Sequence, residues 1–198
     1  KAGLTPVRIS RIADRLSGVF TAPVVPFHTG LPLPSVAETA RALNLAVDDI
    51  GFDGHGLAAL EGGPRFFHVP VKSRAALAAC KVLEPHWSSL LKPLTGIDAA
   101  YVYTRGGDAP GTAFRARMFA PTGGIPEDPA TGSATALLAA QLLQAEKLRD
   151  GTHHWQLEQG YEMGRPSDLR LEADVAAGRL AAVRVGGSAV PMMAGEIE

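Results

Sequence analysis

Most apolar residues of this chain fall into short segments that alternate with polar residues, as half-buried strands do. Proline and glycine, with 15 and 22 residues, are spread between these segments and indicate short elements joined by tight turns. Glu61-Gly-Gly-Pro64 lies between two of them and indicates a hairpin. The pattern predicts strands at residues 4–12, 17–25, 57–60, 65–69, 97–104, 113–120, 154–158, 169–173, 180–185 and 189–193.

Three helices are predicted from serine or proline residues that precede a helical repeat of apolar positions. Ser35 precedes such a repeat at residues 36–45, and Ser73 precedes another one that runs through residue 83. Serine is a favoured N-cap because its hydroxyl accepts a hydrogen bond from a free backbone N–H of the first turn. A short third helix is expected to follow Pro85.

A fourth helix, at residues 131–148, is apolar nearly all round. Only Gln141 and Gln144 interrupt its apolar surface before Glu146. A helix of that kind is buried on every side. Because strands outnumber helices and hairpins are frequent, we predict an α+β fold in which a mostly antiparallel sheet wraps around this central helix.

The loop ahead of the fourth helix carries the candidate chemistry. Two carboxylates, Glu127 and Asp128, stand just before the triplet Thr131-Gly132-Ser133 that opens the helix. The first N–H groups of a helix have no partner within it and mark the positive end of its dipole, so such a start binds anions. A small residue at 132 lets a ligand approach the backbone, and the neighbouring hydroxyls add donors. We therefore predict a site for a substrate carboxylate.

A purely structural interpretation of the same residues is also open. Thr131 would then only cap the helix, and Asp128 would only accept hydrogen bonds from amides of its own loop. Residue spacing by itself favours neither interpretation.

The motifs around this loop resemble the phenazine-biosynthesis PhzF-like family, which shares the diaminopimelate epimerase fold. The octapeptide that contains both carboxylates is specific, and weaker resemblance runs from about residue 18 to the end. The motifs stand in the family's order: Arg117-Met-Phe-Ala-Pro121, Glu127-Asp-Pro-Ala-Thr-Gly-Ser-Ala134, Gln159-Gly160, Met163-Gly-Arg-Pro-Ser167 and Val185-Gly-Gly-Ser-Ala-Val190.

The resemblance implies a cofactor-independent isomerase or epimerase that moves protons on a small carboxylate substrate by acid–base catalysis. It gives Asp128 and Ser133 catalytic roles, with Asp128 orienting the substrate or relaying a proton. Thr131, Gly132 and Ser133 are implied to bind the substrate. Relatives with two catalytic cysteines have one at the position of Pro129, whereas Cys80 lies far upstream in an apolar helical pattern, so Cys80 is interpreted as a core residue.

The family's general base is not found here in its usual form. The resemblance places a glutamate in a motif similar to N-x-S-E-x-x-F, and a partner histidine in a later G-H-A/P segment. Glu38 lies in a predicted helix instead, and His55 in Gly54-His55-Gly56 stands much closer to Ser133 than the family spacing. We interpret His55 as a surface-turn histidine and expect the base to lie outside this chain.

The resemblance also divides the chain, as the C-terminal two-thirds of a family member. Residues 1–24 are expected to be a remnant of an N-terminal domain and residues 25–185 a C-terminal epimerase-like domain. Residues 186–198 would be a closing strand that returns to the N-terminal domain. The chain would thus hold one complete half of the fold plus strands of a second, with residues 4–12 and the closing strand together and short of sheet partners.

Composition narrows the remaining classes of function. With 19 basic and 20 acidic residues the formal net charge is −1, and no run of either sign indicates a nucleic-acid surface. No segment approaches the roughly 20 apolar residues of a membrane span. A single cysteine and histidines without metal-ligand spacing predict neither a disulfide nor a metal, and we expect no cofactor. A cytoplasmic protein is expected, with a homodimer as one expected assembly.

Taken together, the sequence predicts a PhzF-like isomerase whose general base is supplied by a missing N-terminal segment or a partner chain. The 198-residue chain alone would then be inactive. The alternative is a non-catalytic fragment or subunit that binds a carboxylate.

Overall fold

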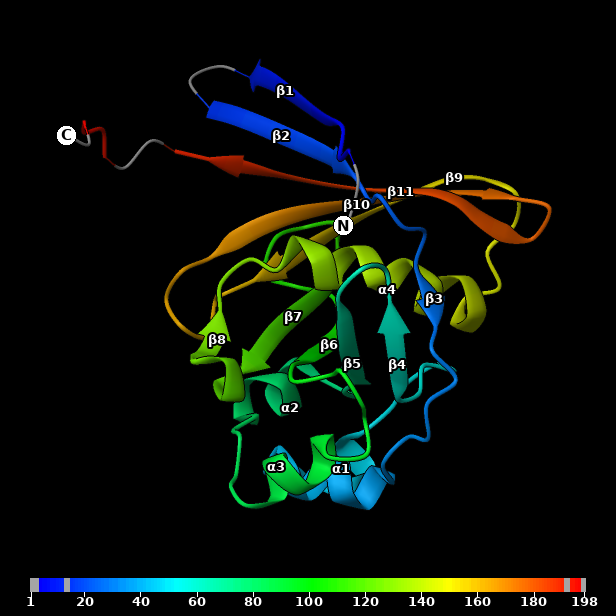
Figure 1. Cartoon of the computed structure of the whole chain (residues 1–198), viewed down its shortest axis with the longest axis vertical. Coiled ribbons are helices and arrows are strands. Elements are labelled where there is room, and N and C mark those ends of the chain that lie inside the picture. The colour runs from blue at the N-terminus through cyan, green and yellow to red at the C-terminus, as the bar shows by residue number, and fades with distance from the viewer. Residues whose placement is uncertain (1–3, 13–14, 191–192, 197–198) are drawn as a thin grey trace.

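The computed structural model describes residues 4–12, 15–190 and 193–196, which form one sheet of 11 strands and four α-helices (Figure 1). The strands are β1 (Val7–Ile12), β2 (Arg15–Thr21), β3 (Phe27–His28), β4 (Ala58–Glu61), β5 (Arg65–Pro70), β6 (Ala100–Arg105), β7 (Thr112–Ala120), β8 (Ile125–Asp128), β9 (Gly151–Gln159), β10 (Ser167–Ala176) and β11 (Arg179–Ala189). The helices are α1 (Val36–Ala42), α2 (Arg74–Ala79), α3 (His86–Leu91) and α4 (Gly132–Ala145), with 3-10 turns at Val47–Asp49 and Pro121–Gly123.

The strands follow the order β1-β2-β11-β10-β9-β7-β6-β5-β4-β3, and β8 pairs with β7 beside this path. Neighbouring strands are antiparallel except for two parallel pairs, β5 with β6 and β7 with β9. The hairpin predicted around Glu61-Gly-Gly-Pro64 is confirmed as β4 and β5. The predicted α+β class with a mostly antiparallel sheet is therefore confirmed.

Helix α4 lies inside the curve of this sheet (Figure 1). Residues 134–142 are all buried, and the helix packs against β10 and β11 on one side and against β3, β4 and β5 on the other. Gln141, which interrupts the apolar surface, is buried as well and donates to the carbonyl of Gly56 at 3.0 Å. The prediction of a helix enclosed by sheet is confirmed. No helix of the described ranges is long and apolar enough to cross a membrane.

The other face of the β4–β7 region packs on the three smaller helices. Phe67 and Val102 point from the strands into a second core, where they meet Leu43, Leu77 and Trp87 from the region of α1 to α3. The sheet thus separates α1–α3 from α4, as Figure 1 shows.

At the opposite end of the sheet, β1 pairs with β2 alone among the described residues, and β2 pairs with residues 184–189 of β11. Val7 and Ile9 of β1 are 58% and 71% exposed. Residues 4–12 and the closing strand were expected to lie together. They share this three-stranded end of the sheet, with β2 between them.

The strand predicted at residues 180–185 lies within β11, which continues to Ala189. Gly186 and Gly187 do not interrupt it, because they are paired with β10 on one side and with β2 on the other. Of the separate strand predicted at residues 189–193, only Ala189 is in a strand, and residues 190 and 193 are not. Residues 191–192 of the predicted last strand lie outside the described residues.

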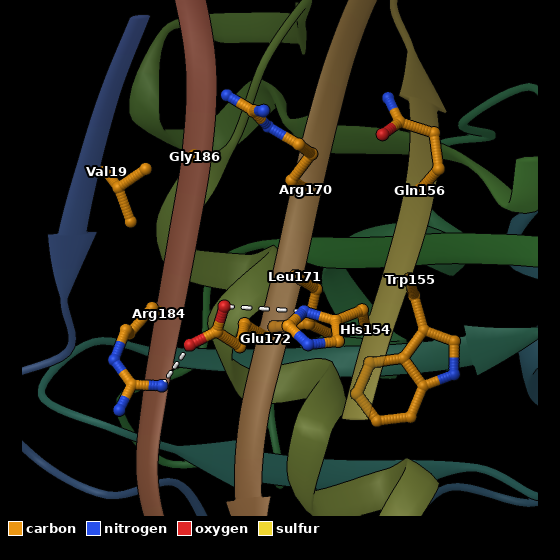
Figure 2. A pocket seen from close by; sticks show the side chains of 9 residues that line it. All are labelled: Val19, His154, Trp155, Gln156, Arg170, Leu171, Glu172, Arg184 and Gly186. Carbon is orange, nitrogen blue, oxygen red and sulfur yellow. Dashed lines mark hydrogen bonds and ion pairs between the residues drawn. The ribbon is translucent and has the colours of Figure 1, made fainter. Parts of the chain in front are cut away.

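Side chains on β9, β10 and β11 alternate between the core and an outer polar face. Leu169, Leu171 and Ala173 of β10 belong to the core around α4. On the outer face of these strands, Arg184 bonds Glu172, and the other carboxylate oxygen of Glu172 lies 3.3 Å from Nδ1 of His154 (Figure 2). These residues line an open cavity of about 390 Å³ that also includes Val19 and Arg170 and none of the predicted site residues.

Because residues 134–142 of α4 are buried, shortening an apolar side chain among them should lower stability. We expect Leu138→Ala, at a fully buried position, to lower the free energy of unfolding by about 2–5 kcal/mol. Gln144→Ala, at an exposed position of the same helix, should change it by less than about 0.5 kcal/mol. Urea denaturation of both variants measures the difference, and equal values would contradict the enclosed position of α4.

Candidate functional site

The loop that leads into α4 is fixed first by Arg117 on β7. Its guanidinium bonds Glu127 through two nitrogens, with both N–O distances 2.8 Å. A third nitrogen donates to the carbonyls of Leu77 and Cys80 at the end of α2, both at 3.0 Å. Glu127, one of the two carboxylates of the motif, is therefore used to hold β8 against β7 and α2.

Gln159, fully buried on β9, holds the residues between β8 and α4. Its side-chain oxygen accepts the Thr131 N–H at 3.0 Å, and its nitrogen donates to the Asp128 carbonyl at 2.7 Å and to the Thr131 hydroxyl at 2.9 Å. The hydroxyl oxygen thus accepts from Gln159, and its own proton is donated to Oδ2 of Asp128 at 2.5 Å. The sequence predicted no role for Gln159, because its partners lie about 30 residues away in the chain.

Gly160 allows the segment that begins at Gln159 to pack closely against the octapeptide around Asp128. Its φ of +80° lies in the left-handed region, and a Cβ there would come within 2.3 Å of the Arg165 carbonyl oxygen and 2.8 Å of that of Pro129. Only glycine fits that position. The segment that begins at Gln159 and the octapeptide around Asp128, separate in sequence, are therefore packed together at the start of α4.

The first amides of α4 have no protein partner among the described residues. Thr135 is the first helical residue whose N–H is bonded within the helix, to the Thr131 carbonyl at 3.0 Å. Neither the N–H groups of residues 132–134 nor the Ser133 hydroxyl has a hydrogen-bond partner there, and Gly132 and Ser133 are partly exposed. A small anion could accept these hydrogen bonds.

Helix α1 shows a contrast, because the N–H of Glu38 in its first turn is bonded to the N-cap side chain. The Ser35 hydroxyl accepts the Glu38 N–H at 3.2 Å, and the Glu38 carboxylate accepts the Ser35 N–H at 2.8 Å, a complete capping box. Thr131 occupies the N-cap of α4 but its side chain makes no capping bond. The structural interpretation is therefore changed in its details: Thr131 is the N-cap residue without a side-chain capping bond, and Asp128 accepts from the Thr131 hydroxyl rather than from loop amides.

Two details bear on the predicted site residues. Gly132 packs on the neighbouring strands, since a Cβ there would lie 3.1 Å from Phe20 of β2 and 3.7 Å from Val185 of β11. Close packing is thus a second reason for glycine at this position. The single hydroxyl proton of Thr131 is donated to Asp128, so ligand binding through this hydroxyl would require that bond to break.

Asp128 is partly buried, and its second oxygen, Oδ1, has no partner among the described residues. The predicted set of Asp128, Thr131, Gly132 and Ser133 thus lies on one short stretch, where a carboxylate, a free hydroxyl and free amides adjoin. Their roles toward a substrate stay predictions.

His55 is not a surface-turn histidine, and that interpretation is wrong. It is 3% exposed, with Nδ1 2.8 Å from the Tyr103 hydroxyl, Nε2 3.6 Å from Glu146, and its ring stacked on Phe52. Burial, with the nearby Arg105 cation, lowers its pKa. Glu146 follows the last residue of α4, so the helix, which is 14 residues long, holds His55 about 20 Å from Ser133.

The other two residues weighed from the sequence are also placed away from the α4 start. Glu38 belongs to the capping box of α1, across the sheet, where its bonds with Ser35 lower its pKa. Cys80 is 1% exposed, and burial raises its pKa to about 12, so it is the core residue that the sequence indicated. Within the described ranges, no group of three or more acidic, histidine or cysteine side chains could hold a metal ion.

Residues 1–195 match the family of phenazine biosynthesis-like proteins, PhzC-PhzF. An uncharacterized isomerase of Mesorhizobium japonicum is 38% identical over 158 residues, which are 79% of this chain and 52% of that protein. The trans-2,3-dihydro-3-hydroxyanthranilate isomerase of Pseudomonas aeruginosa is 32% identical over 159 residues, with 79% and 53% covered. The chain spans about half the length of these curated relatives.

Solved structures give the same fold. A PhzF-family phenazine biosynthesis protein of Bacillus anthracis superimposes with a TM-score of 0.80 at 21% identity, over 94% of this chain and 62% of that one. A predicted epimerase of Pseudomonas aeruginosa gives a TM-score of 0.67 at 25% identity, over 96% and 64%. The expected epimerase-like fold is thereby supported.

The role of Gln159 can be tested by removing its donor. Gln159→Glu would keep the oxygen that accepts the Thr131 N–H but would replace the nitrogen with a buried oxygen that faces the Asp128 carbonyl and cannot donate to it. We expect the free energy of unfolding to fall by at least about 2 kcal/mol, as for an unsatisfied buried polar group. Gln156→Glu makes the same change on the outer face of β9, near the exposed Arg170, and should be neutral. Similar losses of the free energy of unfolding in both variants, measured by urea denaturation, would contradict the role of Gln159 in holding the residues between β8 and α4.

Proposed function

This chain belongs to the PhzC-PhzF family of phenazine biosynthesis-like proteins, and we propose that it supplies the anion-binding wall of an isomerase. The reaction would be an acid–base proton transfer, without a cofactor, on a small carboxylate substrate. The observation that carries the proposal is the start of α4, where the amides of Gly132 and Ser133 and the Ser133 hydroxyl have no partner among the described residues.

In this proposal the substrate carboxylate accepts hydrogen bonds from those amides and from the Ser133 hydroxyl. The free Oδ1 of Asp128 then faces the remainder of the substrate, where it orients a polar group or relays a proton. Thr131 supports the carboxylate of Asp128 through its hydroxyl. The substrate class is supported by the relative named for trans-2,3-dihydro-3-hydroxyanthranilate, which itself carries a carboxylate.

We further propose that the general base comes from outside these 198 residues, from an N-terminal segment of a longer protein or from a partner chain. Two observations support this. Glu38 and His55 both lie away from the start of α4. The chain also covers about half of its curated relatives, 52% and 53% of their lengths. Without the base, the same residues would make a carboxylate-binding subunit, which is the second candidate function.

Binding can be tested on the chain alone. Benzoate, an aromatic carboxylate, should raise the thermal midpoint of unfolding because it binds only the native state. Ser133→Ala should weaken binding by about 1 kcal/mol, the typical contribution of one hydrogen bond, which is about fivefold in Kd. Ser89→Ala removes an exposed helical hydroxyl from α3 and should leave the titration unchanged. An absence of any midpoint shift with benzoate would contradict the anion site.

Catalysis can be tested by deuterium exchange. We expect the chain alone not to catalyse exchange of solvent deuterium into trans-2,3-dihydro-3-hydroxyanthranilate, followed by NMR, because a positioned base typically contributes about 10²–10⁴-fold in rate. Fusion behind the N-terminal segment of the Mesorhizobium japonicum relative should restore exchange.

In that fusion, Asp128→Asn should reduce exchange by about 10²-fold or more, again the contribution of one acid–base group. Asp48→Asn, at an exposed position of the first 3-10 turn, is the matched control and should retain full exchange. Robust exchange by the unfused chain would show that the base lies within it, and would sink the proposal of a base supplied from outside.

A further inference from the structure

Polar side chains lie beneath the first turn of α4, inside an otherwise apolar core. Tyr101 on β6 and His68 on β5 are both 0% exposed. Each bonds the first turn of the helix rather than a neighbouring strand. Buried polar groups lower stability unless they are hydrogen-bonded, so the acceptor of each proton indicates which part of the helix start these side chains support.

The first chain of hydrogen bonds starts at Tyr101. Its hydroxyl lies 2.9 Å from Oγ1 of Thr135, and that hydroxyl donates to the Thr131 carbonyl at 3.0 Å. A threonine hydroxyl has one proton, which here is used on Thr131, so Tyr101 must be the donor to Thr135. Burial raises the pKa of Tyr101, which keeps its phenol protonated.

The second chain starts at His68. Its Nε2 lies 3.0 Å from the carbonyl oxygen of Ala134, which can only accept, so Nε2 carries the proton. Burial lowers the pKa of His68 to about 4, and the ring is therefore neutral at pH 7. The Ala134 carbonyl shares its peptide group with the Thr135 N–H, which donates to the Thr131 carbonyl at 3.0 Å.

Both chains therefore end on the Thr131 carbonyl. This carbonyl and the Gly132 N–H are the two ends of one resonant peptide group. Hydrogen bonds accepted by a carbonyl polarise its peptide and strengthen the N–H at the other end, an effect of roughly 10–30% per bond. The Gly132 N–H is one of the amides that has no partner among the described residues.

We propose that Tyr101 and His68 are positioning residues that polarise the Thr131–Gly132 peptide and so strengthen the Gly132 N–H as an anion donor. The inference rests on the proposed function for the identity of the ligand, whereas the polarisation of the peptide exists without a ligand. The chain contains its own control. Tyr103, on the same strand and equally buried, bonds His55 near the opposite end of α4 and has no link to Thr131.

The test is the chemical shift of the Gly132 amide proton in ligand-free, uniformly labelled protein, assigned by triple-resonance NMR. Tyr101→Phe and Thr135→Val should move this proton upfield, whereas Thr135→Ser, which keeps the hydroxyl, should leave it near its original position. Tyr103→Phe should leave it unchanged. The double variant Tyr101→Phe/Thr135→Val should match Thr135→Val alone, because Tyr101 acts through Thr135.

Benzoate titration of the same proteins supplies the second readout. We expect Tyr101→Phe to raise the Kd for benzoate about two- to threefold. Removing one donor weakens the polarisation of the peptide and so weakens the charge-assisted hydrogen bond from the Gly132 N–H to the anion. Tyr103→Phe should not change the Kd.

The two readouts separate the two ideas. An unmoved Gly132 proton in Tyr101→Phe overturns the positioning role, whatever happens to binding. A moved proton together with no benzoate binding by the wild-type chain supports the network and removes the anion site of the proposed function. If Tyr101→Phe does not fold, the comparison of Thr135→Val with Thr135→Ser tests the hydroxyl through which Tyr101 acts, and an unmoved Gly132 proton in Thr135→Val overturns the role of Tyr101.

Discussion

A helix without a polar face must be covered on every side, and the burial of α4 constrains most of this structure. The sheet can enclose α4 only if its ends curve toward each other, which brings β3–β5 and β10–β11 to opposite sides of the helix. The lateral surface of α4 is then filled by apolar side chains of the sheet. Polar contacts of this helix are therefore few, and apart from its two ends they lie at residues 134, 135 and 141, which bond His68, Tyr101 and Gly56.

The two ends of α4 differ in the partners that the chain provides for them. Beyond the C-terminal end, Glu146 is paired with Arg105 at 2.9 Å and lies beside His55, so the chain supplies its own partners there. At the N-terminal end no acidic side chain occupies the first turn, and Thr131 donates to Asp128 instead of capping. The N-terminal end carries the positive partial charge of the helix dipole, and its N–H groups at residues 132–134 have no partner among the described residues. These free amides are the physical argument for a ligand, and they do not depend on resemblance to other proteins.

The sequence predicted the features that depend on the local pattern of residues and missed those that depend on contacts between residues far apart in the chain. The apolar surface from Leu137 to Leu142 predicted the enclosed helix, and the two-glycine turn predicted the β4–β5 hairpin. His55 stands between glycines in a turn, which is typical of an exposed residue. Its burial depends on Tyr103 and Glu146, far away in sequence.

The candidate site shows the same division. The residues of the helix start could be predicted, because a dipole and free amides follow from the helix alone. The hydrogen bonds of Gln159 and Tyr101 could not, because they join strands whose neighbours no periodicity specifies. These contacts determine how the proton of Thr131 and the carbonyl of Thr131 are used, and hence which groups remain for a ligand.

Strand β2, within the segment expected to belong to an N-terminal domain, also borders the helix start. Its Phe20 lies against Gly132 beside Val185 of β11, and β2 pairs on its far side with β1. With strands about 4.8 Å apart, β1 lies roughly one strand spacing beyond β2, and its outer edge has no partner among the described residues. A segment that paired with β1 would be held at a fixed position relative to Gly132 and Ser133 through two hydrogen-bonded strands. A general base brought in by such a segment would therefore be placed by the sheet itself. This is how a site divided between two pieces of a fold could keep the short distances that proton transfer requires.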